Sequence, residues 1–153
     1  MYRLPLLATA IVSAMFVLPA QAEKASMSPE SLKKVATHVV TGQVMAVYQR
    51  TEEDSNWKYV RYVAEIRVKD CEKGEGVKGG DLVYVRYWEP GWVGTGLVPP
   101  STSGHRGLPN GKDHVRVYLS RNAYDGFSDD NKDGGFNVIG ANGFEILKAT
   151  PGK

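Results

Sequence analysis

The sequence predicts a small, mostly β domain, in which five strands form a closed barrel and one short N-terminal helix precedes them. Three observations lead to this fold class. Apolar and polar residues alternate along several runs, as in strands with one buried and one solvated face. Glycine-rich and polar segments separate these runs. Of the 153 residues, 131 follow a removable export signal of 22, which is enough for one domain.

The first 22 residues are predicted to be a signal peptide. Arg3 supplies the positive start, residues 4–18 are apolar, and residues 20–22 form a cleavage site of the A-x-A type before Glu23. The apolar stretch is shorter than the roughly 20 residues that span a bilayer, which argues against a membrane anchor. We therefore expect an exported protein, periplasmic or extracellular, with one domain over residues 23–153 and no membrane span after signal removal.

Charge and cysteine content narrow the classes of function. The whole chain carries a formal charge of +2, and removal of Arg3 with the signal leaves +1. Because this charge is weak and the basic residues are scattered, nucleic acid is not an expected partner. Cys71 is the only cysteine, so no intramolecular disulfide supports the fold. A buried, inert thiol is the expected state of Cys71, and a reactive thiol is the alternative.

The short helix is predicted over residues 28–36. Ser28 is suited to the N-cap, Pro29 to the first turn, and Glu30 faces the positive end of the helix dipole. The apolar side of the helix, which we expect to lie across one end of the barrel, consists of Leu32, Val35 and Ala36.

Five strands are expected after the helix, over residues 39–48, 57–68, 81–88, 114–119, and a broken fifth strand at 136–139 and 144–147. In the first strand, Gly42 suggests a bulge, and a polar loop is expected over residues 49–56. The Asn142-Gly143 pair predicts a tight turn between the two halves of the fifth strand.

Alternation also predicts which side chains point inward. One face of the first strand carries Val40, Val44, Ala46 and Tyr48. The apolar face of the second strand carries Val60, Tyr62, Ala64, Ile66 and Val68, while Tyr59, Arg61, Glu65 and Arg67 lie on the solvated face. The inward residues of the fourth strand are Val115, Val117 and Leu119.

Five curled strands and one short helix are the elements of an OB-like barrel, whose closure hides its strand edges, and a small open sandwich is the alternative. Strand patterns lie at residues 39–44, 62–68, 80–85, 115–119 and 142–146, with Lys73-Gly74 after the second, and they are spread over most of the mature domain. In these patterns the sequence resembles the netrin-module and tissue-inhibitor-of-metalloproteinase group of OB-folds, especially its bacterial, cysteine-poor relatives.

The resemblance implies a non-enzymatic domain that binds another protein. In the animal inhibitors, the amine and carbonyl of an amino-terminal cysteine meet the zinc of a protease. This chain departs from that pattern, because its predicted mature terminus is Glu23 and the disulfide cysteines of the family are absent. The fold therefore carries over better than the inhibitory mechanism.

A long connection over residues 88–112 is the candidate binding region. It is rich in glycine and proline, and loops of this length are uncommon unless they are functional or disordered. Aromatic side chains there could present contact area to a peptide or a sugar, and the candidate contact residues are Tyr87, Trp88, Trp92 and His105. The alternative is that Trp88 and Trp92 plug the mouth of the barrel.

A possible calcium loop lies further along the chain. Asp129, Asn131 and Asp133 stand at alternate positions before Gly134, as in a loop that wraps calcium with oxygen ligands. The acid expected six residues after the glycine is missing, because position 140 is Gly140. An ordinary turn between the fourth and fifth strands is the alternative. No other cofactor is predicted.

Two classes of function follow from these observations. The first is an exported, non-enzymatic interaction domain that acts through its long loop on an exported or envelope protein. The second is a calcium-dependent protein, or a small hydrolase whose site is assembled from distant residues. Because no nucleophile, base and acid converge in the sequence, we predict the first class and expect a monomer.

Overall fold

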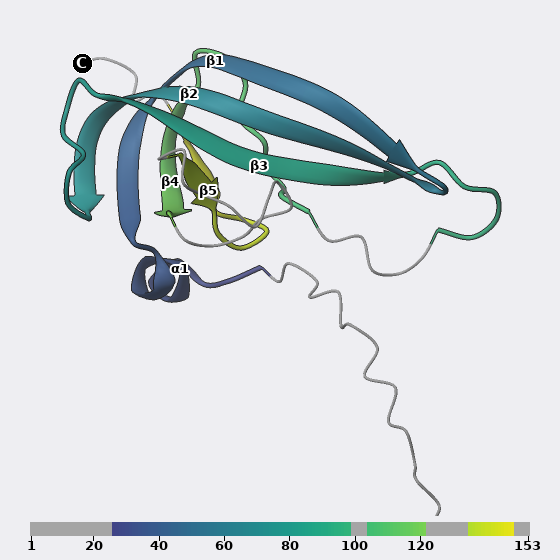
Figure 1. Cartoon of the computed structure of the whole chain (residues 1–153). Coiled ribbons are helices and arrows are strands. Elements are labelled where there is room, and N and C mark those ends of the chain that lie inside the picture. Colours follow the sequence, from purple (N-terminus) through teal and green to yellow (C-terminus); the bar gives the residue numbers. More distant parts are fainter. Residues whose placement is uncertain (1–25, 99–103, 122–134, 149–153) are drawn as a thin grey trace, which may run out of the picture.

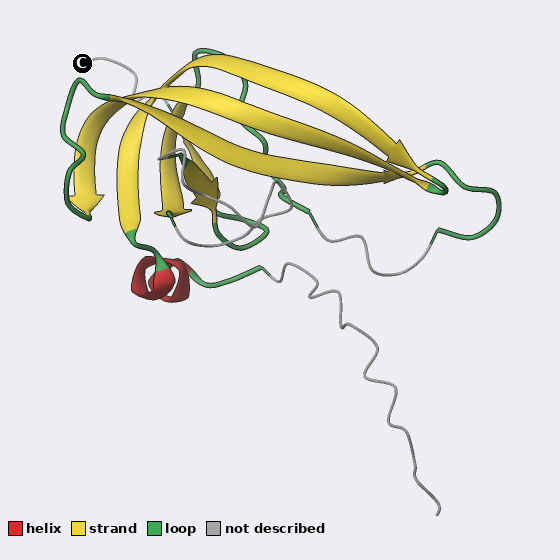
Figure 2. Ribbon diagram, in the orientation of Figure 1, coloured by secondary structure: helices red, strands yellow, loops and turns green. Residues whose placement is uncertain are grey.

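The computed structural model describes residues 26–98, 104–121 and 135–148. In these ranges the helix α1 (Pro29–Val35) comes before the strands β1 (His38–Asp54), β2 (Trp57–Lys73), β3 (Leu82–Trp92), β4 (His114–Ser120), β5 (Phe136–Val138) and β6 (Phe144–Leu147). The mostly β fold class is confirmed (Figure 2). The predicted signal peptide and the motif from Asp129 to Asp133 lie outside the described residues. No helix in the described ranges is long and apolar enough to cross a membrane.

The strand pairings form a ring. β1 pairs antiparallel with β2 and with β4, β2 pairs antiparallel with β3, and β4 pairs antiparallel with β5. The parallel pairing of β3 with β5 completes the circuit. β6 also pairs with β4, so β5 and β6 lie in succession along one edge of that strand. This is the broken fifth strand that the turn signal predicts: the Tyr118 carbonyl accepts from the Ile139 amide, and the Tyr118 amide donates to the Gly143 carbonyl.

The core fills the ring with inward side chains from all six strands. Its buried members include the predicted inward residues of β4 and part of the predicted apolar face of β2, namely Val115, Val117, Leu119, Ala64, Ile66 and Val68. A second cluster joins α1 to the ring through Leu32, Ala36, Val39 and Tyr118. The helix begins as predicted, with the Ser28 hydroxyl accepting from the Ser31 amide at 3.2 Å. Val35 is 55 % exposed, however, because the short helix buries only the side that carries Leu32 and Ala36.

β1 contains the predicted irregularity at Gly42 and a second one that inverts its faces. The pairing with β2 shifts between Thr41 and Gly42, and a Cβ atom on Gly42 would collide with the Arg67 carbonyl oxygen. Another shift lies between Val44 and Ala46. Beyond it Val47 packs against the core, and Tyr48 is 57 % exposed. The prediction that Tyr48 shares a face with Val44 is therefore wrong, because an extra residue in one strand moves later side chains to the other face.

The strands β1, β2 and β3 are longer than the sequence indicates. Only Ser55 and Asn56 turn between β1 and β2, so most of the predicted polar loop at residues 49–56 is strand. β3 runs on to Trp92, past the predicted end at Trp88. Figure 1 shows these three strands continuing beyond β4 and β5. We call this extension, made of residues 48–54, 57–62 and 87–92, the arm.

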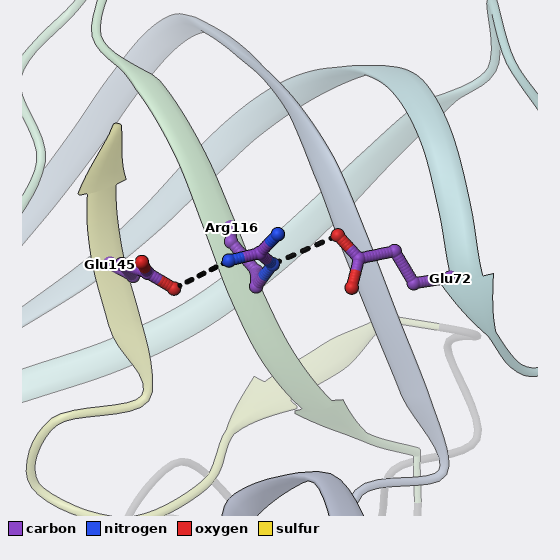
Figure 3. A network of polar contacts seen from close by, with 3 residues as sticks. All are labelled: Glu72, Arg116 and Glu145. Carbon is purple, nitrogen blue, oxygen red and sulfur yellow. Dashed lines mark hydrogen bonds and ion pairs between the residues drawn. The ribbon is translucent and has the colours of Figure 1, made fainter. Parts of the chain in front are cut away.

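A charged cluster joins three strands on the outside of the ring (Figure 3). Arg116 on β4 donates from Nε to Glu72 of β2 at 2.8 Å and from Nη1 to Glu145 of β6 at 2.9 Å. The hydrogen bonds that Arg116 donates to Glu72 and Glu145 raise the pKa of its guanidinium. The cluster ties the short β6 to the rest of the sheet, although partly exposed ion pairs each contribute only about 1 kcal/mol or less.

Candidate binding site on the arm

One face of the arm carries a row of aromatic side chains. In the pairing of β2 with β3, Trp57 lies opposite Trp92, Tyr59 opposite Pro90, and Arg61 opposite Trp88. Because directly opposed residues share a face and alternate residues return to it, these side chains lie together. They are on the side of the sheet away from the core residue Tyr87. We call the set Trp57, Tyr59, Trp88, Pro90 and Trp92 the aromatic face, and each member is partly exposed.

The rings of the aromatic face contact each other in two pairs. Trp57 and Trp92 meet edge to face, with ring centroids 5.1 Å apart and planes at 73°. Tyr59 and Trp88 are tilted, with centroids 6.0 Å apart. Such pairs stabilise by about 0.5–1.5 kcal/mol beyond the area they bury. The aromatic side chains are therefore held in place before any partner arrives.

Trp92 ends a strand and does not lie in a loop, which corrects the prediction for residues 88–112. The chain leaves β3 directly against the β1–β2 turn, where the Asn56 carbonyl accepts from the amides of Val93 at 2.9 Å and Gly94 at 3.2 Å. The Trp92 Nε1 atom is buried and has no hydrogen-bond partner. Trp92 therefore combines a partly exposed ring with a structural role at the end of the arm.

An ion-pair cluster borders the aromatic face on β1. Glu52, opposite Tyr59, accepts from Arg61 Nε at 2.7 Å and pairs with Arg50 Nη2 at 2.8 Å. The hydrogen bond from Arg61 is the main cause that lowers the pKa of Glu52, and the charges of both arginines act in the same direction. The cluster places polar groups of both signs beside the aromatic rings.

Tyr87 belongs to the core and not to the exposed surface. Its side chain is fully buried, stacks on Tyr62 with centroids 4.9 Å apart and planes at 9°, and meets the edge of Phe144. Burial is the main cause that raises the pKa of Tyr87. Its hydroxyl is buried without a hydrogen-bond partner. The sequence suggested Tyr87 as a contact residue, and the structure instead places its side chain in the core.

Tyr62 lies beside Tyr87 and uses its hydroxyl differently. The Tyr62 Oη atom donates to Glu89 Oε1 at 2.5 Å. Burial, followed by the hydrogen bond to Glu89, raises the pKa of Tyr62 to about 12. The two stacked phenols thus lie at the base of the arm, where the Tyr62 hydroxyl is hydrogen-bonded and the Tyr87 hydroxyl is not.

His105 supports the arm from the edge of β3. It is 4 % exposed, its amide donates to the Trp88 carbonyl at 2.8 Å, and its Nδ1 accepts from the Trp88 amide at 3.1 Å. The Nε2 atom lies 3.2 Å from the Val138 carbonyl. The Nδ1 atom also lies 3.0 Å from the Trp88 carbonyl, so both ring nitrogens of His105 contact backbone groups. His105 positions Trp88 and is too buried to be the contact residue that the sequence suggested.

Metal-ligating side chains do not cluster in the described part of the chain. In the ranges described, no three His, Cys, Asp or Glu residues lie close enough to hold a metal ion. The calcium motif of Asp129, Asn131 and Asp133 lies outside those ranges. Cys71 is partly buried, packs against the core, and donates from Sγ to the Lys73 carbonyl at 3.2 Å.

The search for similar proteins found no matching protein family, characterised protein or solved structure. The candidate site therefore depends on the geometry of the chain itself. Sequence reasoning identified Trp88 and Trp92 but missed Trp57 and Tyr59 as members of the same surface. The available signal was two aromatic residues at alternate positions on the solvated face of the second strand, followed by Arg61.

Proposed function

We propose that this protein is an exported, non-enzymatic binding domain that contacts a partner protein through the aromatic face of the arm. The proposal includes an OB-like closed barrel as the scaffold, supported by the five-strand ring of pairings. In OB-folds, the face of strands 2 and 3 is where ligands bind. The aromatic face lies on β2 and β3, and the resemblance to netrin-like domains also favours a protein partner.

The observation that carries the proposal is the composition of this one face. Tryptophan, tyrosine and arginine are the residues that most often dominate binding energy in protein interfaces. Here one contact between two tryptophans and one contact between a tyrosine and a tryptophan lie beside the ion pairs of Glu52 with two arginines. The rings are already ordered by each other, so binding costs little side-chain entropy. A surface of this kind suits a specific protein contact without any chemical step.

The test is site-specific photo-crosslinking in the native envelope or medium. A photoreactive residue at Tyr59 should capture one partner, whereas the same residue at Tyr84 should not. Tyr84 is a matched control because it is a tyrosine on β3, 50 % exposed, on the same side of the sheet but outside the arm. With the purified partner, Tyr59→Ala should weaken binding by about 2 kcal/mol. Equal capture from both positions, or unchanged affinity of Tyr59→Ala, would reject the aromatic face.

A further inference from the structure

Beyond Val44, β1 has a long edge that no described strand covers. Its pairing with β4 ends at Gln43, and Val44 still bonds to the backbone of Lys112 and Asp113. From there to Asp54, β1 pairs with β2 alone. In the described part of the chain, the other edge of residues 45–54 therefore presents unpaired backbone N–H and C=O groups. Such an edge is a template for an added strand.

The other sheet edges are protected in ways that this one is not. On β3, Pro90 has no N–H group, and the Trp88 amide and carbonyl both bond to His105. On the far side of β4, β6 is a strand of only four residues. Proline, covering loops and short edge strands are devices that prevent unwanted pairing. The open edge of β1 contains no proline and no glycine between Met45 and Asp54.

The side chains along this edge differ between its two ends. Near the ring, Met45 is 45 % exposed and Tyr48 is 57 % exposed. At the tip, Glu53 and Asp54 are exposed carboxylates that form no ion pair with any described residue, although Lys58 lies opposite Glu53 on β2. Glu52, in contrast, is already paired with two arginines. An occupant that matches the edge is therefore apolar at one end and basic at the other.

We propose that residues 45–54 bind an extended, basic segment of the partner protein as an added antiparallel strand. Hydrogen bonds between the two main chains would supply affinity, and the contacts of the segment's side chains with those of β1 would determine the direction in which the segment binds. In the antiparallel orientation, the amino-terminal end of the segment lies at Glu53 and Asp54 and carries lysine or arginine. Its carboxyl-terminal end is apolar and lies by Met45 and Tyr48. This inference rests on the proposed function, because it specifies how a protein partner engages the arm.

The experiment titrates the mature protein with synthetic eight-residue peptides. The probe has two lysines near its amino terminus and alternating threonine and valine after them. One control peptide has glutamate in place of lysine, and another carries N-methyl groups on alternate amides, which blocks strand pairing without changing charge. We expect the lysine probe to shift the amide resonances of residues 45–54. The glutamate peptide should bind at least about fivefold more weakly, and the N-methylated peptide should not bind.

A charge-reversed variant tests the direction of binding. Glu53→Lys combined with Asp54→Lys should reverse the preference between the lysine and glutamate peptides, and Glu65→Lys, on β2 outside the arm, should leave it unchanged. Equal binding of the N-methylated peptide, no shifts in residues 45–54 at millimolar probe, or no reversal would each overturn the proposal. A concentration-dependent dimer that buries the same amides would overturn it in favour of a second copy.

The two proposals fail separately in these tests. If shifts appear only around Tyr59 and Trp88, the edge proposal is wrong while the aromatic face survives. If the peptide pairs with residues 45–54 but Tyr59 captures no partner in the envelope, the aromatic face is wrong and the edge stands.

Discussion

Removal of one hydroxyl from each of two stacked tyrosines should change stability in opposite directions. Tyr62 and Tyr87 lie with ring centroids 4.9 Å apart and nearly parallel planes. The Tyr62 hydroxyl donates to Glu89, whereas the Tyr87 hydroxyl is buried without a partner. Substitution by phenylalanine keeps the ring and the stack in both cases. The difference between the two variants therefore isolates what each oxygen contributes.

The expected magnitudes follow from hydrogen-bond energetics. An unsatisfied buried polar group costs about 1–3 kcal/mol, so Tyr87→Phe should raise the free energy of unfolding by about 1 kcal/mol. A hydrogen bond to a charged group contributes about 1.5–3 kcal/mol, and Tyr62 is partly exposed, so Tyr62→Phe should lower the free energy of unfolding by about 1.5 kcal/mol. For a domain of this size, each kcal/mol corresponds to a change in Tm of about 4 °C.

Equilibrium unfolding in urea, followed by tryptophan fluorescence, measures both variants against the mature wild type. The slope of free energy against urea should stay constant, because neither variant changes the surface exposed on unfolding. If Tyr87→Phe loses as much stability as Tyr62→Phe, the Tyr87 hydroxyl has a partner such as a buried water, and the reasoning is wrong. If Tyr62→Phe is neutral, the contact with Glu89 contributes nothing.

Four further outcomes can be checked directly. Because the folded pKa of Tyr62 is raised from 10.0 to about 12, stability should fall as pH rises through that window, and Tyr62→Phe should show a smaller loss in alkaline urea unfolding. Gly42→Ala should cost about 2 kcal/mol or more by thermal unfolding, since its Cβ would meet the Arg67 backbone, whereas Gly91→Ala, whose Cβ finds ordinary contacts at 3.7 Å or more, should cost less. The intact mass of the exported protein should correspond to a chain that starts at Glu23, and retention of Met1 would contradict export by signal cleavage. Added calcium should leave Tm unchanged, and a rise that Asp133→Asn abolishes would favour the calcium alternative.

The alternation of apolar and polar residues predicted the strands that have one buried face. It did not predict the parts of strands in which both faces are exposed. β4 was located correctly because Val115, Val117 and Leu119 alternate with polar residues. Residues 49–54 are polar on both faces, and this pattern predicts a loop where the structure has a strand. Residues 49–54 of β1 are mostly exposed, so this part of the strand is held mainly by backbone pairing with β2. Backbone pairing does not require apolar residues at alternate positions, and the sequence therefore carries no alternation that would reveal the strand.

The sequence predicted only part of the candidate site, because the local pattern around its residues resembles a loop. Trp88 and Trp92 were noticed through their residue type, but Pro90 and Gly91 between them suggested a loop. Proline is tolerated at a sheet edge, and at Pro90 the outer edge of β3 pairs with no described strand. Tyr87 and Trp88 are neighbours in sequence, yet one is buried and the other lies on the aromatic face. Which of the two is buried depends on which face of β3 each side chain lies on, and this became clear only from the structure.

In the proposed function, the aromatic face stabilises the arm as well as contacting the partner. Beyond the ring, the three strands lose the support of β4 and β5, and a few strands without a packed face are marginally stable alone. The Trp57–Trp92 contact and the Glu52 ion pairs lie where that support is missing. Truncation of Trp92 therefore removes structure and contact area together, so loss of binding by that variant would not identify a contact. Tyr59 is the more informative position, because its opposite neighbour on β3 is Pro90 and the turn contacts of Asn56 do not involve it.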